Sequence, residues 1–183
     1  MKRVIFVSTF ILLFIFCGFT QNLQQFTIND GKATCDIIPF YETPYTRVTS
    51  DPVIQILYNR DSLNDMKDRI LRGITFHTTT TKAQAVIDVI VKETNRTKAG
   101  SMIAGGTTVF KGLVNIKSNK IYIPFNKIYR YKGKTLVIKI TIIQSDRISC
   151  KGITTTAKKQ TLIVGAGLWN HVTFSPLTTF IYY

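Results

Sequence analysis

Residues 135–143, with the sequence TLVIKITII, constrain the fold more than any other stretch of the chain. β-Branched and aliphatic side chains occupy almost every position, and this composition favours a pleated, largely buried strand over a helix. Asp146 and Arg147 end the apolar run ahead of Cys150. The segment therefore predicts a buried strand in a β-rich protein.

Further short strands are predicted on both sides of this run, separated by glycines, prolines and polar clusters such as Asn29-Asp30-Gly31 and Ser175-Pro176. The candidates are residues 32–39, 53–58, 74–80, 85–91, 109–116, 161–164, 172–174 and 178–183. Residues 62–73 are the one plausible helix, because Ser62 can cap it and Gly73 would end it. An ordered loop is the alternative, since so short a helix is marginal in water.

Strands at this density predict an all-β fold. We expect residues 21–183 to form a single-domain β-sandwich of roughly seven to ten strands, with one short helix near residues 62–72.

The first twenty residues have the pattern of a secretory signal peptide. Lys2 and Arg3 precede an apolar run that ends at Cys17, and small residues before Gln21 suit cleavage there. A membrane anchor is the alternative, but the run is shorter than the roughly 20 apolar residues that a spanning helix needs. We therefore expect a secreted, extracellular protein without a transmembrane anchor.

Removal of residues 1–20 leaves two cysteines, Cys35 and Cys150. In an oxidising compartment an even pair most simply forms one disulfide. Two unpaired buried thiols are the alternative.

Asn95-Arg96-Thr97 is an acceptor for N-glycosylation in a cell that glycosylates secreted proteins.

Positive charge is concentrated in the second half of the chain. Residues 95–183 contain fourteen Lys and Arg against one acid, Asp146. Such a field attracts anions, among them phospholipid headgroups, sulfated glycans and acidic proteins. For a secreted chain, lipid or glycan partners are favoured and no nucleic acid is expected. A solvated cationic surface that keeps the protein soluble is the alternative.

The densest basic segment surrounds Gly133, where cations alternate with aromatic rings. The cations are Lys127, Arg130, Lys132 and Lys134, and we expect them to contact an anionic lipid. The rings are those of Tyr129 and Tyr131, and we expect them, together with Trp169, to contact an apolar ligand. The alternative is an ordinary hairpin with its lysines in water and its tyrosines in the core.

The residues make a poor case for catalysis. The two histidines, His77 and His171, have no nucleophile or carboxylate at a spacing that selects it. Cys35 and Cys150 lack neighbouring ligands at metal-binding spacing. We therefore expect no enzyme activity, no cofactor and no metal. A hydrolase would require a cleft that joins one histidine to a hydroxyl and a carboxylate.

Three segments resemble the nematode transthyretin-like secreted proteins. They are Gly31-Lys32-Ala33-Thr34-Cys35; Ile56-Leu57-Tyr58 with the acids Asp61, Asp65 and Asp68; and Tyr122-Ile123-Pro124 followed by TLVIKI, Arg147 and Cys150. The resemblance spans about residues 31–150. It implies a transthyretin- or immunoglobulin-like sandwich and a carrier or lipid-surface bridging role.

We therefore expect a secreted, non-enzymatic binding protein. It would act as a carrier or surface-binding protein for lipid, amphipathic or anionic ligands. The alternative is a secreted effector or structural module that docks on a protein or a sulfated glycan.

Overall fold

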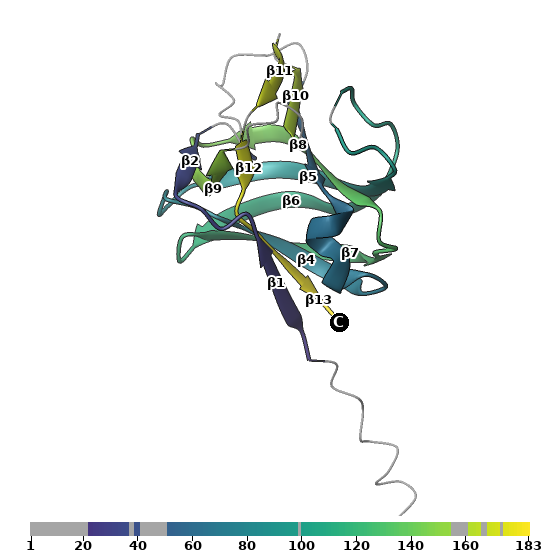
Figure 1. The fold of residues 1–183 in the computed structure, drawn as a ribbon. Helices are drawn as coiled ribbons and strands as arrows, with labels where there is room; N and C mark the ends of the chain where they lie inside the picture. Colours follow the sequence, from purple (N-terminus) through teal and green to yellow (C-terminus); the bar gives the residue numbers. More distant parts are fainter. Residues whose placement is uncertain are drawn as a thin grey trace, which may run out of the picture.

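The computed structural model describes residues 22–36, 39–40, 51–98, 100–154, 161–165, 168–172 and 174–183, with only the backbone described for residues 161–172. These ranges contain thirteen strands and one short 3₁₀ helix, η1 (Arg60–Met66) (Figure 1). The predicted all-β fold is confirmed. The predicted signal peptide, residues 1–20, lies outside the described residues.

Ten strands form one antiparallel sheet that curls on itself (Figure 1). Their order is β1 (Gln24–Ile28), β13 (Thr178–Tyr182), β4 (Ile70–His77), β7 (Lys120–Arg130), β6 (Thr107–Lys117), β5 (Gln84–Thr94), β8 (Thr135–Ser145), β3 (Val53–Tyr58), β10 (Thr161–Gly165) and β11 (Leu168–Val172). A second sheet has the order β12 (Phe174–Pro176), β9 (Cys150–Thr154) and β2 (Ala33–Cys35).

Strand β8 contains the apolar run that the sequence singles out. It pairs with β5 on one side and with β3 on the other. Six of its residues from Thr135 are buried in succession, because the inward face joins the core and a loop covers part of the outward face. The predicted buried strand is confirmed.

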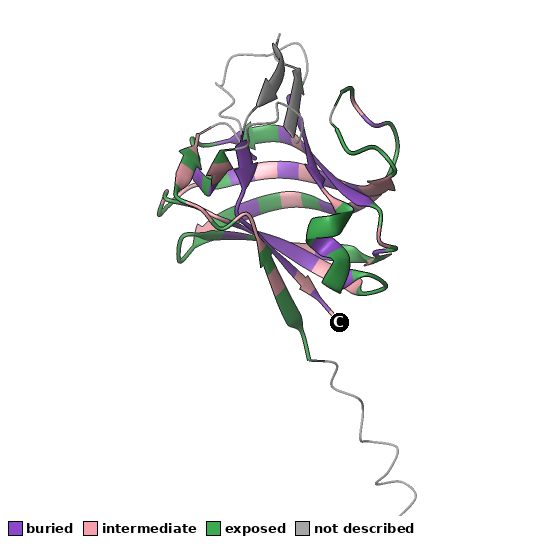
Figure 2. Cartoon of the chain, viewed as in Figure 1, coloured by how far each residue is buried: buried purple, intermediate pink, exposed green. Residues whose placement is uncertain are grey.

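The two halves of the curled sheet meet face to face, as the predicted sandwich requires. The ring of Tyr58 in β3 packs edge-on against Phe180 in β13, with centroids 5.2 Å apart. Its hydroxyl shares a 2.8 Å hydrogen bond with Oγ1 of Thr178. Because β3 and β13 are distant in the sheet order, these contacts cross the core. Burial is concentrated between the halves (Figure 2).

The pairing between β6 and β7 is short. Their register contains only two pairs, Ile116 with Ile121 and Lys117 with Lys120, next to the connecting turn. Beyond these pairs β6 bonds only to β5, and β7 only to β4. Regular pairing between the two strands therefore ends close to the turn, and we call the stretch beyond it the seam.

Strand β7 also contains a large bulge. Gly73 of β4 pairs with Pro124, whereas Leu71 pairs with Tyr129, so residues 125–128 of β7 lie opposite Arg72 alone. Proline cannot donate a ladder hydrogen bond, and bulges bend a strand and redirect its side chains. The bulge places residues 125–128 away from regular pairing.

Three local predictions need correction. The helix is confirmed only as η1, because residues 70–73 form the start of β4 and Gly73 lies within that strand. Ser175 and Pro176, expected to interrupt strands, belong to β12 and pair with Ile153 and Gly152. Within the described part of the predicted strand at residues 32–39, the strand is β2, three residues long, and residues 37–38 lie outside the described residues.

Candidate functional site

The turn between β7 and β8 is organised around one carboxylate, that of Glu93 on β5. Glu93 accepts backbone hydrogen bonds from the N–H of Lys132 at 3.0 Å and from the N–H of Lys134 at 3.0 Å. Gly133 between them has a φ of 87°, a left-handed conformation that suits glycine. Two converging N–H groups of this kind form an anion-binding nest. Here the nest is occupied by the chain's own acid.

Cations and aromatic rings lie on opposite faces of this segment. The four predicted cations, Lys127, Arg130, Lys132 and Lys134, are all exposed. Tyr131 is fully buried, and its hydroxyl donates a 2.7 Å hydrogen bond to the carbonyl of Lys134. Burial and the charge of Glu93 raise the pKa of Tyr131 to about 12. The two-faced hairpin therefore exists, with its cations in water.

The aromatic part of the predicted site is largely withdrawn from the surface. The buried ring of Tyr131 cannot meet an external ligand, so we remove it from the candidate site. Tyr129 is half-buried, and its hydroxyl lies 3.5 Å from Glu93. Burial, followed by the charge of Glu93, raises its pKa. Trp169 lies in β11, and its side chain is outside the described residues.

An apolar residue missing from the sequence-based site lies among these cations. Ile128, in the β7 bulge, is 70% exposed. It follows Lys127 directly and lies two residues before Arg130, which is also exposed. The signal that the sequence offered was an isoleucine placed between a basic and an aromatic residue, Lys127 and Tyr129. We call Ile128 and the four cations the β7 surface.

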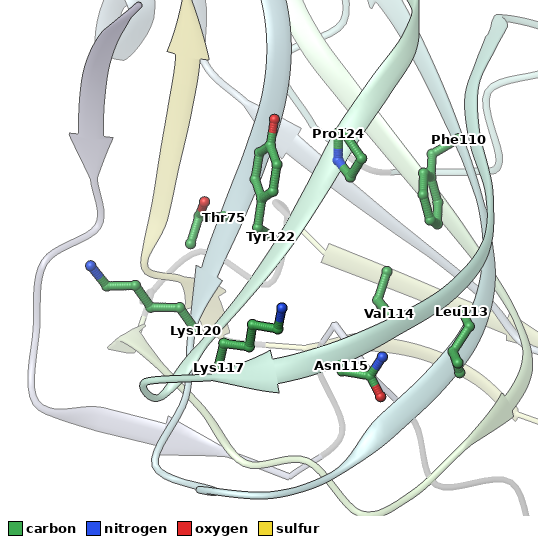
Figure 3. A pocket seen from close by; sticks show the side chains of 9 residues that line it. All are labelled: Thr75, Phe110, Leu113, Val114, Asn115, Lys117, Lys120, Tyr122 and Pro124. Carbon is green, nitrogen blue, oxygen red and sulfur yellow. The ribbon is translucent and has the colours of Figure 1, made fainter.

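A groove opens along the seam where β6 and β7 separate. Its deeper part has a volume of about 420 Å³ and is lined by Thr75, Phe110, Leu113, Val114, Asn115, Lys117, Lys120, Tyr122 and Pro124. Figure 3 shows the β6 side chains on one wall and Tyr122 and Pro124 of β7 on the other. An adjoining hollow of about 400 Å³ shares Phe110 and extends to Lys127. We call the two together the β6–β7 groove.

His77 does meet a hydroxyl, which the sequence could not show. Its Nε2 lies 2.9 Å from Oγ1 of Thr179, which in turn shares a 2.8 Å hydrogen bond with Oγ1 of Thr27. Thr179 is only 5% exposed. A nucleophile must be reachable by its substrate, so this chain of hydroxyls is better suited to holding β1, β13 and β4 together.

The two cysteines are brought together by the small sheet. Cys35 in β2 is the register partner of Cys150 in β9. Both are free thiols in the structure, so the predicted disulfide is not present. Burial raises the pKa of the Cys150 thiol, whereas Cys35 is half-buried. The structure therefore juxtaposes the predicted pair without bonding it.

The predicted glycosylation site, Asn95, lies beside one cation of the β7 surface. Asn95 is exposed and lines a small cleft of about 150 Å³ with Lys134 and Thr135. Within the described ranges, no three His, Cys, Asp or Glu side chains gather as metal ligands. No helix in the described part of the chain is long and apolar enough to cross a bilayer.

Comparisons with protein families, with curated proteins and with solved structures find no match to this chain. The resemblance to transthyretin-like proteins therefore stays a hypothesis based on short motifs.

Proposed function

We propose that this protein is a secreted, non-enzymatic binding protein that docks reversibly on anionic lipid surfaces through the β7 surface. One observation carries the proposal: Ile128 is 70% exposed directly after Lys127, in the same short segment as the exposed Arg130 and Lys132. Cations that meet headgroups around an apolar residue that enters the interface are the usual parts of a peripheral membrane contact.

The expected strength of this contact is moderate. Each cation near an anionic membrane contributes about 1 kcal/mol, and full burial of an isoleucine contributes about 1.5–3 kcal/mol. Four cations and Ile128 together therefore give about 6 kcal/mol. Exposed charges are screened within about 8 Å at physiological ionic strength, so binding should be reversible and sensitive to salt.

The turn is ordered before any ligand arrives, which supports a binding role. Glu93 fixes the N–H groups of Lys132 and Lys134, and Tyr131 fixes the carbonyl of Lys134. A surface whose backbone is already ordered loses less conformational entropy on binding. These internal bonds leave the ammonium groups of the lysines directed to solvent.

The proposal includes two features carried over from the sequence. Residues 1–20 would direct secretion, and the oxidising compartment would allow Cys35 and Cys150 to form a disulfide. The antiparallel register supports the bond, since directly opposed residues have Cα atoms about 4.5–5.5 Å apart and disulfides span about 4.4–6.8 Å.

Co-sedimentation with liposomes tests the proposal. The mature protein should bind vesicles that contain phosphatidylserine and ignore neutral ones, and high salt should release it. Replacement of Lys127, Arg130, Lys132 and Lys134 by alanine should weaken binding at least a hundredfold. The matched control replaces four other exposed lysines, Lys32, Lys82, Lys98 and Lys151, and should weaken binding much less.

Ile128→Asn separates a lipid surface from the alternative, a sulfated glycan or an acidic protein. Loss of the apolar contact should weaken vesicle binding about tenfold and leave the salt dependence unchanged. Ile143→Asn is the control, since Ile143 is 49% exposed on β8. If Ile128→Asn binds vesicles like the parent protein, the lipid-insertion part of the proposal fails and a glycan or protein partner takes its place.

A further inference from the structure

The seam between β6 and β7 leaves strand edges without partners. After the pairs at Ile116 and Lys117, no register joins the two strands. Successive peptide groups of a strand point to opposite neighbours, so alternate N–H and C=O groups of residues 107–115 face away from β5 and toward the seam. Unpaired edges of this kind are templates for another strand.

The β7 wall offers the same chemistry. Residues 125–128 pair neither with β4 nor with β6 in the registers of the described strands. Pro124 supplies a carbonyl but no N–H. Backbone donors and acceptors therefore line both sides of the outer part of the groove, where the adjoining hollow reaches Asn126 and Lys127.

The side chains of the groove specify the charge of its occupant. Among the described residues no carboxylate lines either hollow, whereas Lys111, Lys117, Lys120 and Lys127 do. Lys111 is paired with Asp88 at 2.6 Å. Lys117, Lys120 and Lys127 form no ion pair with a described residue. The charge complement of this groove is an anion.

The distribution of charge distinguishes a chain from a headgroup. Lys117 and Lys120 lie at the closed end of the seam, and Lys127 lies in the hollow at its open end. Apolar side chains, including Phe110, Val114 and Tyr122, form the surface between them (Figure 3). A single lipid headgroup would satisfy one end only, whereas an extended segment that alternates acids and apolar residues can match the whole length.

We propose that the β6–β7 groove binds an extended acidic polypeptide segment by strand addition. The segment pairs with the free edges of β6 and β7, places apolar side chains against Phe110 and Val114, and places carboxylates near Lys117, Lys120 and Lys127. Main-chain hydrogen bonds provide affinity in this mode, and alternate side chains provide specificity. This site extends beyond the proposed lipid contact and shares only Lys127 with it.

A synthetic probe tests both parts of this proposal. The probe is a fluorescent, N-acetylated octapeptide that alternates valine and glutamate, and binding is followed by fluorescence anisotropy. It should bind, and a valine–lysine octapeptide should not. Two further analogues of the valine–glutamate peptide are N-methylated on alternate amides, so that each analogue is blocked along one of the two edges of the extended peptide. At least one of them should bind ten times more weakly, because N-methylation removes donors for strand pairing.

Hydrogen exchange tests strand pairing independently, because charge attraction alone would not protect backbone amides of β6. On addition of the valine–glutamate probe, backbone amides of residues 107–115 should exchange at least fivefold more slowly. Amides in β1, on the outer edge of the sheet, should be unaffected.

Matched charge reversals locate the site. Lys117→Glu with Lys120→Glu should weaken probe binding at least tenfold. Lys32→Glu with Lys98→Glu removes the same charge elsewhere on the surface and should have little effect. Equal weakening by the two double variants would overturn the proposal, as would undiminished binding of both N-methylated probes. Neither result depends on vesicle binding, so the failure of this proposal is distinct from failure of the lipid contact.

Discussion

Cys35 lies directly opposite Cys150 across the antiparallel pair of β2 and β9. Two further pairs, Thr34 with Lys151 and Ala33 with Gly152, complete the register, so the short β2 is held in place by only three pairs. A covalent link at this position would connect the N-terminal part of the chain to the segment that follows β8.

Oxidation should join Cys35 to Cys150 and stabilise the fold. The bond would close a loop of more than about 100 residues, which in the chain-entropy model contributes about 4–5 kcal/mol. Chemical denaturation of oxidised and reduced protein would measure the difference, and mass spectrometry after thiol labelling would confirm the pairing. Cys35→Ser should remove the difference. Equal stability of the two forms would show that β2 is already fixed by its other contacts.

Glu93→Gln should loosen the turn between β7 and β8. The carboxylate accepts two backbone hydrogen bonds, and the neutral amide accepts more weakly, so the free energy of unfolding should fall by about 1–2 kcal/mol. The change also adds net positive charge. If vesicle binding depends on charge alone, the variant will bind more tightly; if it depends on the ordered turn, as we expect, the variant will bind more weakly in the same co-sedimentation assay.

Acid should destabilise the protein through His77. Burial, followed by the charges of Lys120 and Lys151, lowers the pKa of His77 below its ordinary value of 6.5, while Asp30 acts in the opposite direction. As the pH falls through 6.5, the unfolded chain therefore takes up a proton that the folded protein resists. The stabilising contribution is present above pH 6.5 and is lost as the pH falls below it.

Thermal melts at pH 7.5 and pH 5.5 would measure this effect. His77→Gln keeps a hydrogen-bonding group near Thr179 and should reduce the difference between the two melting temperatures. An unchanged difference would place the acid sensitivity elsewhere in the chain.

Lys139→Met should release the loop that covers the outer face of β8. The side chain of Lys139 is 8% exposed, and its Nζ donates to the carbonyls of Ile103 and Gly105. The same loop is held by Gln55, whose Oε1 accepts from the N–H of Ile103 at 2.8 Å. Loss of the ammonium donors leaves two carbonyls unpaired, so stability should fall by about 1–2 kcal/mol.

Hydrogen exchange at Ile103 would measure the release of this loop directly, and we expect at least tenfold faster exchange in Lys139→Met. Lys117→Met is the control, because Lys117 is exposed beside the turn between β6 and β7. Unchanged exchange at Ile103 would show that Gln55 and the apolar contact between Ile103 and Val137 hold the loop without Lys139.

The local features of the chain were predictable from its sequence. The strand character of residues 135–143 follows from β-branched composition, and the inward Tyr131 with its outward neighbour Lys132 follows from the alternation of side chains along a strand. These features depend on neighbours a few residues away, which the sequence displays directly.

Only the tertiary structure decided which distant segments meet. Glu93 reaches the backbone of Lys132 across 39 residues, and Cys35 meets Cys150 because β2 happens to pair with β9. The seam between β6 and β7 has no sequence signature, and Pro124 alone signals an irregularity in β7 without giving the extent of the bulge, because each arises from the register of paired strands. Register is set by the sum of many weak contacts between strands remote in the chain, and no single residue specifies it.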